Sequence, residues 1–105
     1  MATCSHLAAV KITELPDSSD GCVDCLAIGD PWCHLRICLS CGHVGCCDDS
    51  PNRHASAHAA ASGHPLIRSI QPGEDWSWCF VDETKLRIAG VQGAPKIPRS
   101  PMGCP

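Results

Sequence analysis

Apolar and polar residues alternate over 34–38, which is the pattern of a half-buried β-strand. Further short stretches between turn residues are also typical of strands. Five stretches are expected to form strands: 34–38, 43–46, 66–70, 76–81 and 85–91. Turn residues separate neighbouring stretches, among them Gly42 and the segment 71–74. We therefore expect a small, twisted and mainly antiparallel sheet.

One further stretch has the composition of a helix. Residues 51–62 are rich in alanine, which has the highest helix propensity and allows close packing. Ser50 can cap the N-terminus, Pro51 suits the first turn, and Gly63 can close the C-terminus. The fold class is thus predicted to be α+β, with this main helix packed on the sheet.

The composition limits how far a hydrophobic core can stabilise this fold. The chain has 105 residues, enough for one domain, with nine glycines, nine prolines, one phenylalanine and no tyrosine. Residues 1–92 are expected to form the domain. Residues 93–105 are rich in proline with little to bury, and are expected to form a disordered tail. So modest a core indicates that bound metal is a condition of folding.

Cysteine and histidine supply candidate metal ligands in close pairs. The chain has ten cysteines and six histidines. The pairs are Cys22/Cys25, Cys38/Cys41, His54/His58 and the Cys-x-His at Cys4/His6, and single candidates include Cys46, His64 and Cys79. Zinc takes four such ligands in a tetrahedron. The number of candidate ligands therefore predicts two zinc sites, with a third in addition. His54 and His58 share one helix face and suit one metal, but spacing alone leaves their cysteine partners open.

Two other uses of ten cysteines fit the sequence less well. A disulfide framework is typical of secreted proteins, yet residues 1–12 lack an apolar run long enough for a signal peptide. An iron–sulfur cluster would take four thiolates and no regular complement of histidines. No stretch approaches the roughly 20 apolar residues of a membrane span. We therefore expect a cytoplasmic zinc protein that does not contact a membrane.

The charge argues against nucleic acid as a partner. The formal net charge is −3 at pH 7, and the eight lysines and arginines are scattered along the chain. Nucleic-acid binding relies on clustered basic residues that neutralise phosphates. The expected partner is therefore a protein or peptide.

The ligand pattern as a whole resembles a known family. The resemblance begins with the string LRICLSCGHVGC at 35–46 and continues with His54-x3-His58-x5-His64-Pro65 and with Trp78-Cys79. This pattern is similar to the UBP-type zinc finger, the ubiquitin-tail-binding module found in deubiquitinases and a deacetylase. Cys4-x-His6 and Cys22-x-x-Cys25 match as well. The resemblance covers residues 4–90 and is greatest to the short, free-standing bacterial members.

The resemblance implies a ligand set for three zinc ions. One site would consist of Cys38, Cys41, His54 and His58, and a second, interleaved site of Cys22, Cys25, Cys46 and His64. A third would take Cys4, His6, Cys79 and Asp82. Asp82 stands where the family has a cysteine, and aspartate also ligates zinc. Outside the pattern, Cys47 is expected to be a small buried residue and Cys104 a free, exposed thiol.

The resemblance also implies a peptide-binding pocket. In the family, a tryptophan at the position of Trp78 lines the pocket for the ubiquitin C-terminus, and an arginine grips the peptide carboxylate. Asp48 takes the place of that arginine here, while Phe80 keeps an apolar ring near Trp78. We therefore expect peptide binding at Trp78 and Phe80 and disfavour the ubiquitin tail, unless Arg36 or Arg53 reaches the pocket from another direction.

No grouping of residues suggests catalysis. The well-placed cysteines and histidines are used as ligands of closed sites, whereas a catalytic zinc needs an open position. The predicted function is a non-enzymatic, zinc-binding module for a protein or peptide. The alternative is a thiol redox or zinc-responsive protein acting through Cys33, Cys46 or Cys47, which an exposed Cys47 thiol of low pKa would favour.

Overall fold

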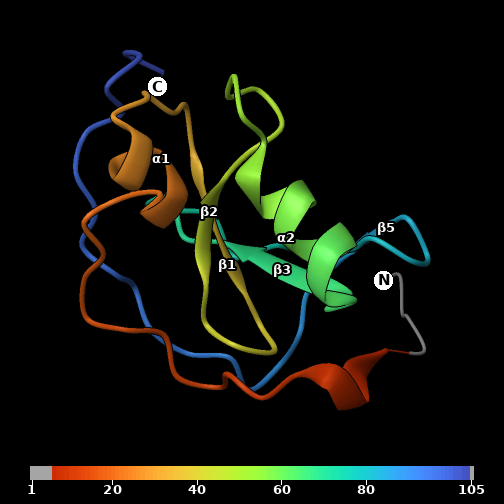
Figure 1. Cartoon of the computed structure of the whole chain (residues 1–105). Helices are drawn as coiled ribbons and strands as arrows, with labels where there is room; N and C mark the ends of the chain where they lie inside the picture. The colour runs from red at the N-terminus through yellow and green to blue at the C-terminus, as the bar shows by residue number, and fades with distance from the viewer. Residues whose placement is uncertain (1–5, 105) are drawn as a thin grey trace.

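A computed structural model describes residues 6–104 of the chain. An antiparallel five-stranded sheet lies at its centre in the order β2-β1-β3-β4-β5 (Figure 1). The strands are β1 (Leu35–Cys38), β2 (Val44–Cys46), β3 (Leu66–Ser69), β4 (Ser77–Cys79) and β5 (Thr84–Leu86). The helices are η1 (Leu7–Ala9), α1 (Val23–Ile28) and α2 (His54–Ser62). The predicted α+β class, with one main helix on a small antiparallel sheet, is confirmed.

The strand register gives the sheet two different faces. Ile67 of β3 pairs with Trp78 of β4, and Trp78 pairs with Lys85 of β5. Paired residues point to the same side of a sheet, and successive residues alternate between sides. Arg36 therefore lies on the same face of the sheet as Ile67 and Trp78. Leu35, the neighbour of Arg36 in β1, points to the other face.

The second face carries the hydrophobic core. Leu35, Ile37 and Leu66 are at most 1 % exposed. They belong to one cluster with Leu15 of the N-terminal loop, and Ile97 near the C-terminus packs against that cluster. The core is therefore closed by two irregular segments from opposite ends of the chain.

Helix α2 covers the first face at β1 and β2. Its close approach depends on Gly45 in the middle of β2, because a Cβ atom there would lie 2.8 Å from the backbone nitrogen of Ala55. The helix ends at Gly63, which has a φ of 75°. This left-handed conformation is the expected glycine C-cap.

Helix α2 begins three residues later than the predicted 51–62. The left-handed Arg53, with a φ of 46°, precedes His54, and no side chain caps the helix. Ser50 does not act as the cap because it lies three residues before the N-cap position, Arg53. Its hydroxyl instead accepts a hydrogen bond from the Cys33 amide at 2.8 Å. The predicted strands 76–81 and 85–91 are also shorter, since the Asp82–Glu83 turn and an irregular segment after Leu86 limit them to β4 and β5.

The C-terminal segment differs from the disordered tail expected for 93–105. It runs beside the N-terminal loop (Figure 1). The Lys96 amide donates to the Asp17 carbonyl at 2.8 Å, and the Ser19 amide donates to the Lys96 carbonyl at 2.9 Å. Pro95 is buried. The prediction relied on composition alone, which does not reveal that backbone hydrogen bonds to 13–19 hold this segment on the core. Within residues 6–104, no helix is long and apolar enough to cross a membrane.

Candidate metal centres and pocket

Three thiols and one imidazole meet where α1, β2 and α2 come together. We call this group, Cys22, Cys25, Cys46 and His54, the inner cluster; its ligand atoms all lie within 4.8 Å of one another. Cys22 caps α1, and its Sγ accepts from the Cys25 amide at 3.4 Å. The Sγ atoms of Cys25 and Cys46 are 3.8 Å apart, and His54 Nδ1 lies 3.2 Å from Cys25 Sγ.

A second group lies at the turn of the β1–β2 hairpin. The hairpin cluster consists of Cys38, Cys41, His58 and His64, whose ligand atoms also lie within 4.8 Å of one another. His58 Nε2 is 3.3 Å from Cys41 Sγ, and His64 Nδ1 is 3.5 Å from Cys38 Sγ. Cys38 is buried, whereas Cys41 is exposed.

The structure corrects the predicted pairing of histidines with cysteines. His54, expected beside Cys38 and Cys41, lies in the inner cluster, and His64, expected beside Cys22 and Cys25, lies in the hairpin cluster. Residues four apart share a helix face but are separated by about 6 Å along its axis. His54 at the helix start therefore reaches the cysteines of α1, while His58 reaches the hairpin. His64 returns to the hairpin after the Gly63 turn.

A third group ties the start of the described chain to the β4–β5 turn. The edge cluster contains His6, Cys79 and Asp82. His6 Nδ1 lies 3.2 Å from Asp82 Oδ2 and 3.5 Å from Cys79 Sγ. Cys4, the fourth predicted ligand, lies outside the described residues. The predicted His6, Cys79 and Asp82 are thus brought together.

The donor chemistry of these clusters fits zinc. Zn–S and Zn–N bonds of about 2.3 and 2.0 Å place the ligand atoms of a tetrahedron roughly 3.5–3.8 Å apart. Four of the six distances between ligand atoms of the inner cluster lie between 3.2 and 3.8 Å, and all six lie within 4.8 Å. Burial raises the pKa of the Cys25 thiol to about 12 and also raises the pKa of Cys22 and of Cys38. Without a cation these buried thiols stay protonated at neutral pH, so a divalent ion is needed to hold them as thiolates.

His43 lies beside the hairpin cluster and supports one of its ligands. Its ring stacks on the His58 ring with centroids 4.5 Å apart, and its Nε2 lies 2.8 Å from Asp24 Oδ2. Burial, assisted by His43 and His64, lowers the pKa of His58. The His58 imidazole is therefore neutral at pH 7, which is the form that binds metal.

The remaining cysteines form a group of their own. Cys33 and Cys104 are joined by a disulfide with a Cα–Cα distance of 5.4 Å. This corrects the expectation that Cys104 is a free thiol. Cys47 is buried, as expected, and is not bonded to another cysteine. Its Sγ, the Cys33 Sγ and a ring nitrogen of His34 lie within 4.8 Å of one another.

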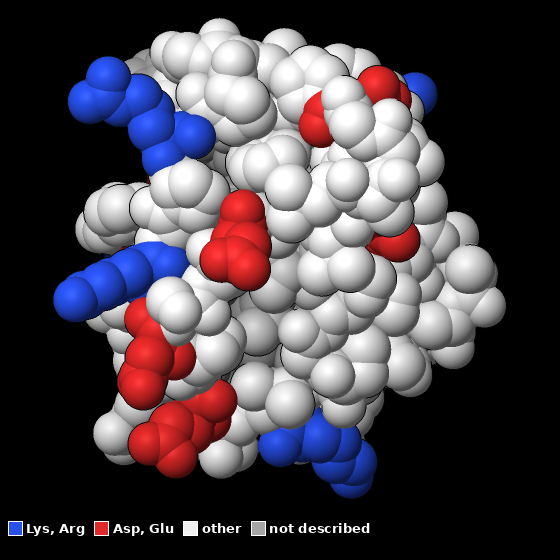
Figure 2. All heavy atoms as spheres, turned by 60° about the vertical axis from the view of Figure 1, so that its left-hand side comes forward, with Lys and Arg blue, Asp and Glu red and all other residues white. Residues whose placement is uncertain are grey.

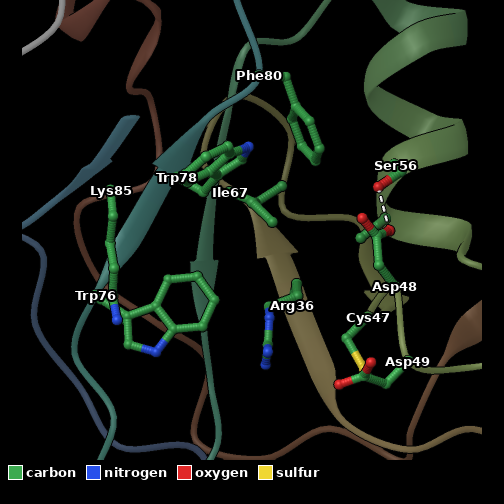
Figure 3. Close-up of a pocket in the computed structure, with 11 residues that line it drawn as sticks. Arg36, Cys47, Asp48, Asp49, Ser56, Ile67, Trp76, Trp78, Phe80 and Lys85 are labelled. Carbon is green, nitrogen blue, oxygen red and sulfur yellow. Dashed lines mark hydrogen bonds between the residues drawn. The ribbon is translucent and has the colours of Figure 1, made fainter. Parts of the chain in front are cut away.

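A pocket of about 290 Å³ lies between α2 and the first face of the sheet. Trp78, Phe80 and Ile67 form its apolar wall (Figure 3). Trp76 and Lys85 lie on one side, and Cys47, Asp48 and Asp49 lie on the side toward α2. The predicted peptide-contacting residues Trp78 and Phe80 therefore line one cavity.

Arg36 enters this pocket from β1. Its guanidinium lies 4.6 Å from the centre of the Trp76 ring, and Lys85 Nζ lies 5.0 Å from the same ring. Arg36 Nη1 donates to the Leu35 carbonyl at 3.0 Å and lies 3.9 Å from Glu74. Burial lowers the pKa of Arg36, while Glu74, Asp49 and Asp48 oppose that effect. Arg36 thus supplies the cation that the sequence lacks at position 48, but acids surround it.

Comparisons with known proteins agree with this geometry. Residues 22–89 match the zf-UBP family, described as the Zn-finger in ubiquitin-hydrolases and other proteins. The chain is also similar to the solution NMR structure of protein RPA1320 from Rhodopseudomonas palustris, with 46 % identity and a TM-score of 0.79 over 94 % of this chain and 97 % of that chain. The family match and the cysteine–histidine clusters identify a zinc-binding module. The chain belongs to the zf-UBP family of zinc fingers.

Proposed function

We propose that the chain is a non-enzymatic interaction module that holds zinc at the inner, hairpin and edge clusters and binds a peptide in the pocket of Trp78 and Phe80. The observation that carries the proposal is the pocket itself. It offers about 290 Å³ beside three aromatic side chains, Trp76, Trp78 and Phe80, on a sheet face that α2 leaves partly uncovered. An apolar pocket with a few charged groups at its edge is typical of a ligand site.

The charges around the pocket favour a peptide with an apolar residue and a basic side chain. Arg36 and Lys85 offset Asp48 and Asp49, so the lining sums to 2 − 2 = 0. Glu74 beside Arg36 adds one further acid. A ligand carboxylate would meet no net positive charge here, whereas a basic side chain could face Asp48 and Asp49. Although Arg36 does reach the pocket, the acids around it offset its charge, so we still disfavour the ubiquitin tail as the partner.

The molecular surface supports a protein or peptide rather than nucleic acid. On the face shown in Figure 2, basic and acidic side chains are interspersed, without a broad basic patch. Phosphate backbones are bound by clustered cations.

Fluorescence polarisation with labelled pentapeptides tests the proposal. The set shares one leucine, carries either lysine or glutamate beside it, and ends in either a free acid or an amide. The lysine peptides are expected to bind more tightly than the glutamate peptides by tenfold or more, with little effect of the terminal group. Trp78→Ala should abolish binding, and Asp48→Asn should weaken it.

Two control variants change residues of the same kind outside the pocket. Leu26→Ala removes an exposed apolar side chain of α1, and Asp20→Asn removes an exposed acid. Both should bind like the unaltered protein. The ubiquitin tail peptide is included in the titration. Tight binding of that peptide, lost in Arg36→Ala and unchanged in Asp48→Asn, would overturn the proposal in favour of a carboxylate-reading pocket.

A further inference from the structure

Three cysteines outside the metal clusters gather behind the pocket. Cys33 is bonded to Cys104, and the free Cys47 Sγ lies within 4.8 Å of the Cys33 Sγ. Cys33 and Cys47 are each 6 % exposed. A free thiol and the buried half of a disulfide are thus held side by side within the described chain, while the other half, Cys104, is partly exposed.

Local hydrogen bonds hold these sulfur atoms together. The Cys47 amide donates to the His34 carbonyl at 3.0 Å, and the His34 amide donates to the Cys47 Sγ at 3.4 Å. The buried Ser50 hydroxyl accepts from the Cys33 amide at 2.8 Å and lies 3.5 Å from the Cys47 Sγ. Because both segments are tied at backbone level, Cys47 stays next to Cys33 without being bonded to it.

We propose that Cys47 and the Cys33–Cys104 disulfide form an internal thiol–disulfide exchange site. The Cys47 thiol loses its proton, and its sulfur attacks the Cys33 Sγ. The Cys33–Cys104 bond breaks as the Cys33–Cys47 bond forms, and Cys104 leaves as a thiolate that takes up one proton. One disulfide and one thiol exist before and after, so the exchange needs no external oxidant or reductant.

The exchange would connect the C-terminal segment with the pocket. Cys104 anchors the end of the chain, which otherwise contacts this region through the hydrogen bond from the Ser100 hydroxyl to the Trp32 carbonyl at 2.9 Å. Cys47 lines the pocket. Forming the Cys33–Cys47 bond therefore frees Cys104 and the very end of the chain, while the backbone hydrogen bonds of Lys96 still hold the preceding residues, and it draws the Cys47 sulfur toward Cys33.

Loop lengths indicate which pairing dominates at rest. The Cys33–Cys104 bond spans 71 residues, whereas a Cys33–Cys47 bond would span 47 − 33 = 14 residues. A disulfide that closes a longer loop restricts the unfolded chain more. The resting protein should accordingly hold Cys33–Cys104, with the exchanged form as a minor species that can be trapped.

Trapping Cys104 tests the exchange directly. The zinc-loaded full chain, with its disulfide intact, is incubated with N-ethylmaleimide without reductant and mapped by non-reducing peptide mass spectrometry. Cys104 should become labelled with time, in molecules that carry a Cys33–Cys47 bond. In Cys47→Ser, Cys104 labelling should fall at least tenfold. A label on Cys47 with Cys33–Cys104 intact, or labelling of Cys104 that persists in Cys47→Ser, would overturn the proposal.

A second variant keeps the test informative if Cys47→Ser folds poorly. In Cys104→Ser, oxidised glutathione should join Cys33 to Cys47 and be reduced to two molecules of glutathione, with the zinc content unchanged. The double variant Cys47→Ser/Cys104→Ser should form no internal disulfide. A Cys46–Cys47 bond with loss of zinc would contradict the proposal, because the reacting thiol would then be part of a metal cluster.

Discussion

The inner cluster and the edge cluster use the same kinds of side chains but differ in their surroundings. Cys22, Cys25 and Cys46 have no exposed surface. In the edge cluster, the side chains of His6 and Asp82 are 30 % and 34 % exposed. The inner cluster joins α1, β2 and α2, whereas the edge cluster joins the start of the described chain to a turn.

This difference indicates which metal the fold depends on. Helix α1 lies outside the sheet, and four of its six residues, Val23, Leu26, Ala27 and Ile28, are exposed and apolar. Its attachment through hydrophobic burial is therefore weak, and the inner cluster supplies it. β4 and β5 already pair with each other in the sheet. An ion at the edge cluster would thus add to a structure that the sheet holds without it.

Breaking the inner cluster should have the largest effect. Cys46→Ser removes one ligand and leaves two buried thiols and His54 without their shared ion. Structural zinc can contribute on the order of 10 kcal/mol, which exceeds the stability of many small domains. We expect the variant to be unfolded at 25 °C by circular dichroism. The adjacent Cys47→Ser is the matched control and should stay folded, and a folded Cys46→Ser with its full zinc content would contradict this view.

Replacing each histidine by alanine tests which cysteines share a metal site with it. His54→Ala should weaken the inner cluster while sparing the hairpin cluster, and His64→Ala should do the reverse. Alkylation under mild chelation, read by mass spectrometry, should then label Cys22 and Cys25 at least tenfold faster than Cys38 and Cys41 in His54→Ala. Faster labelling of Cys38 and Cys41 in that variant would support the pairing expected from the sequence.

The sequence predicted the parts of this molecule that local pattern controls. Alternation located β1, because a half-buried strand has a period of two. Short stretches between turn residues located β2 and β3. Close spacing located Cys22/Cys25 and Cys38/Cys41, because one metal can reach both members of such a pair. The choice among His54, His58 and His64 depends on the direction of α2 relative to two clusters, which no local spacing encodes.

Long-range packing explains the other differences. The segment after Gly93 resembles a linker in composition, but it is held by backbone hydrogen bonds to the Asp17 and Ser19 region. Because nearly every residue has the same backbone N–H and C=O groups, such hydrogen bonds cannot be predicted from residue type. Arg36 reaches the pocket because β1 lies beside β3 and its side chain shares the face of Trp78. That placement requires the strand order, which alternation does not provide.

Removing the edge carboxylate should have the smallest effect. We expect Asp82→Ala to lose one zinc ion by native mass spectrometry and yet remain folded, because the remaining clusters and the sheet are intact. Because the sheet holds this region without the ion, we expect a cost of only about 1 kcal/mol, which corresponds to a Tm lowered by roughly 4–8 °C for a domain of this size. Asp82→Cys introduces a thiolate ligand and should retain the ion.

Asp75→Ala removes an exposed acid paired with Arg87 and serves as the control. An unchanged zinc count in Asp82→Ala would show that Asp82 is not a ligand, and unfolding would show that the edge cluster is as important to the fold as the inner one.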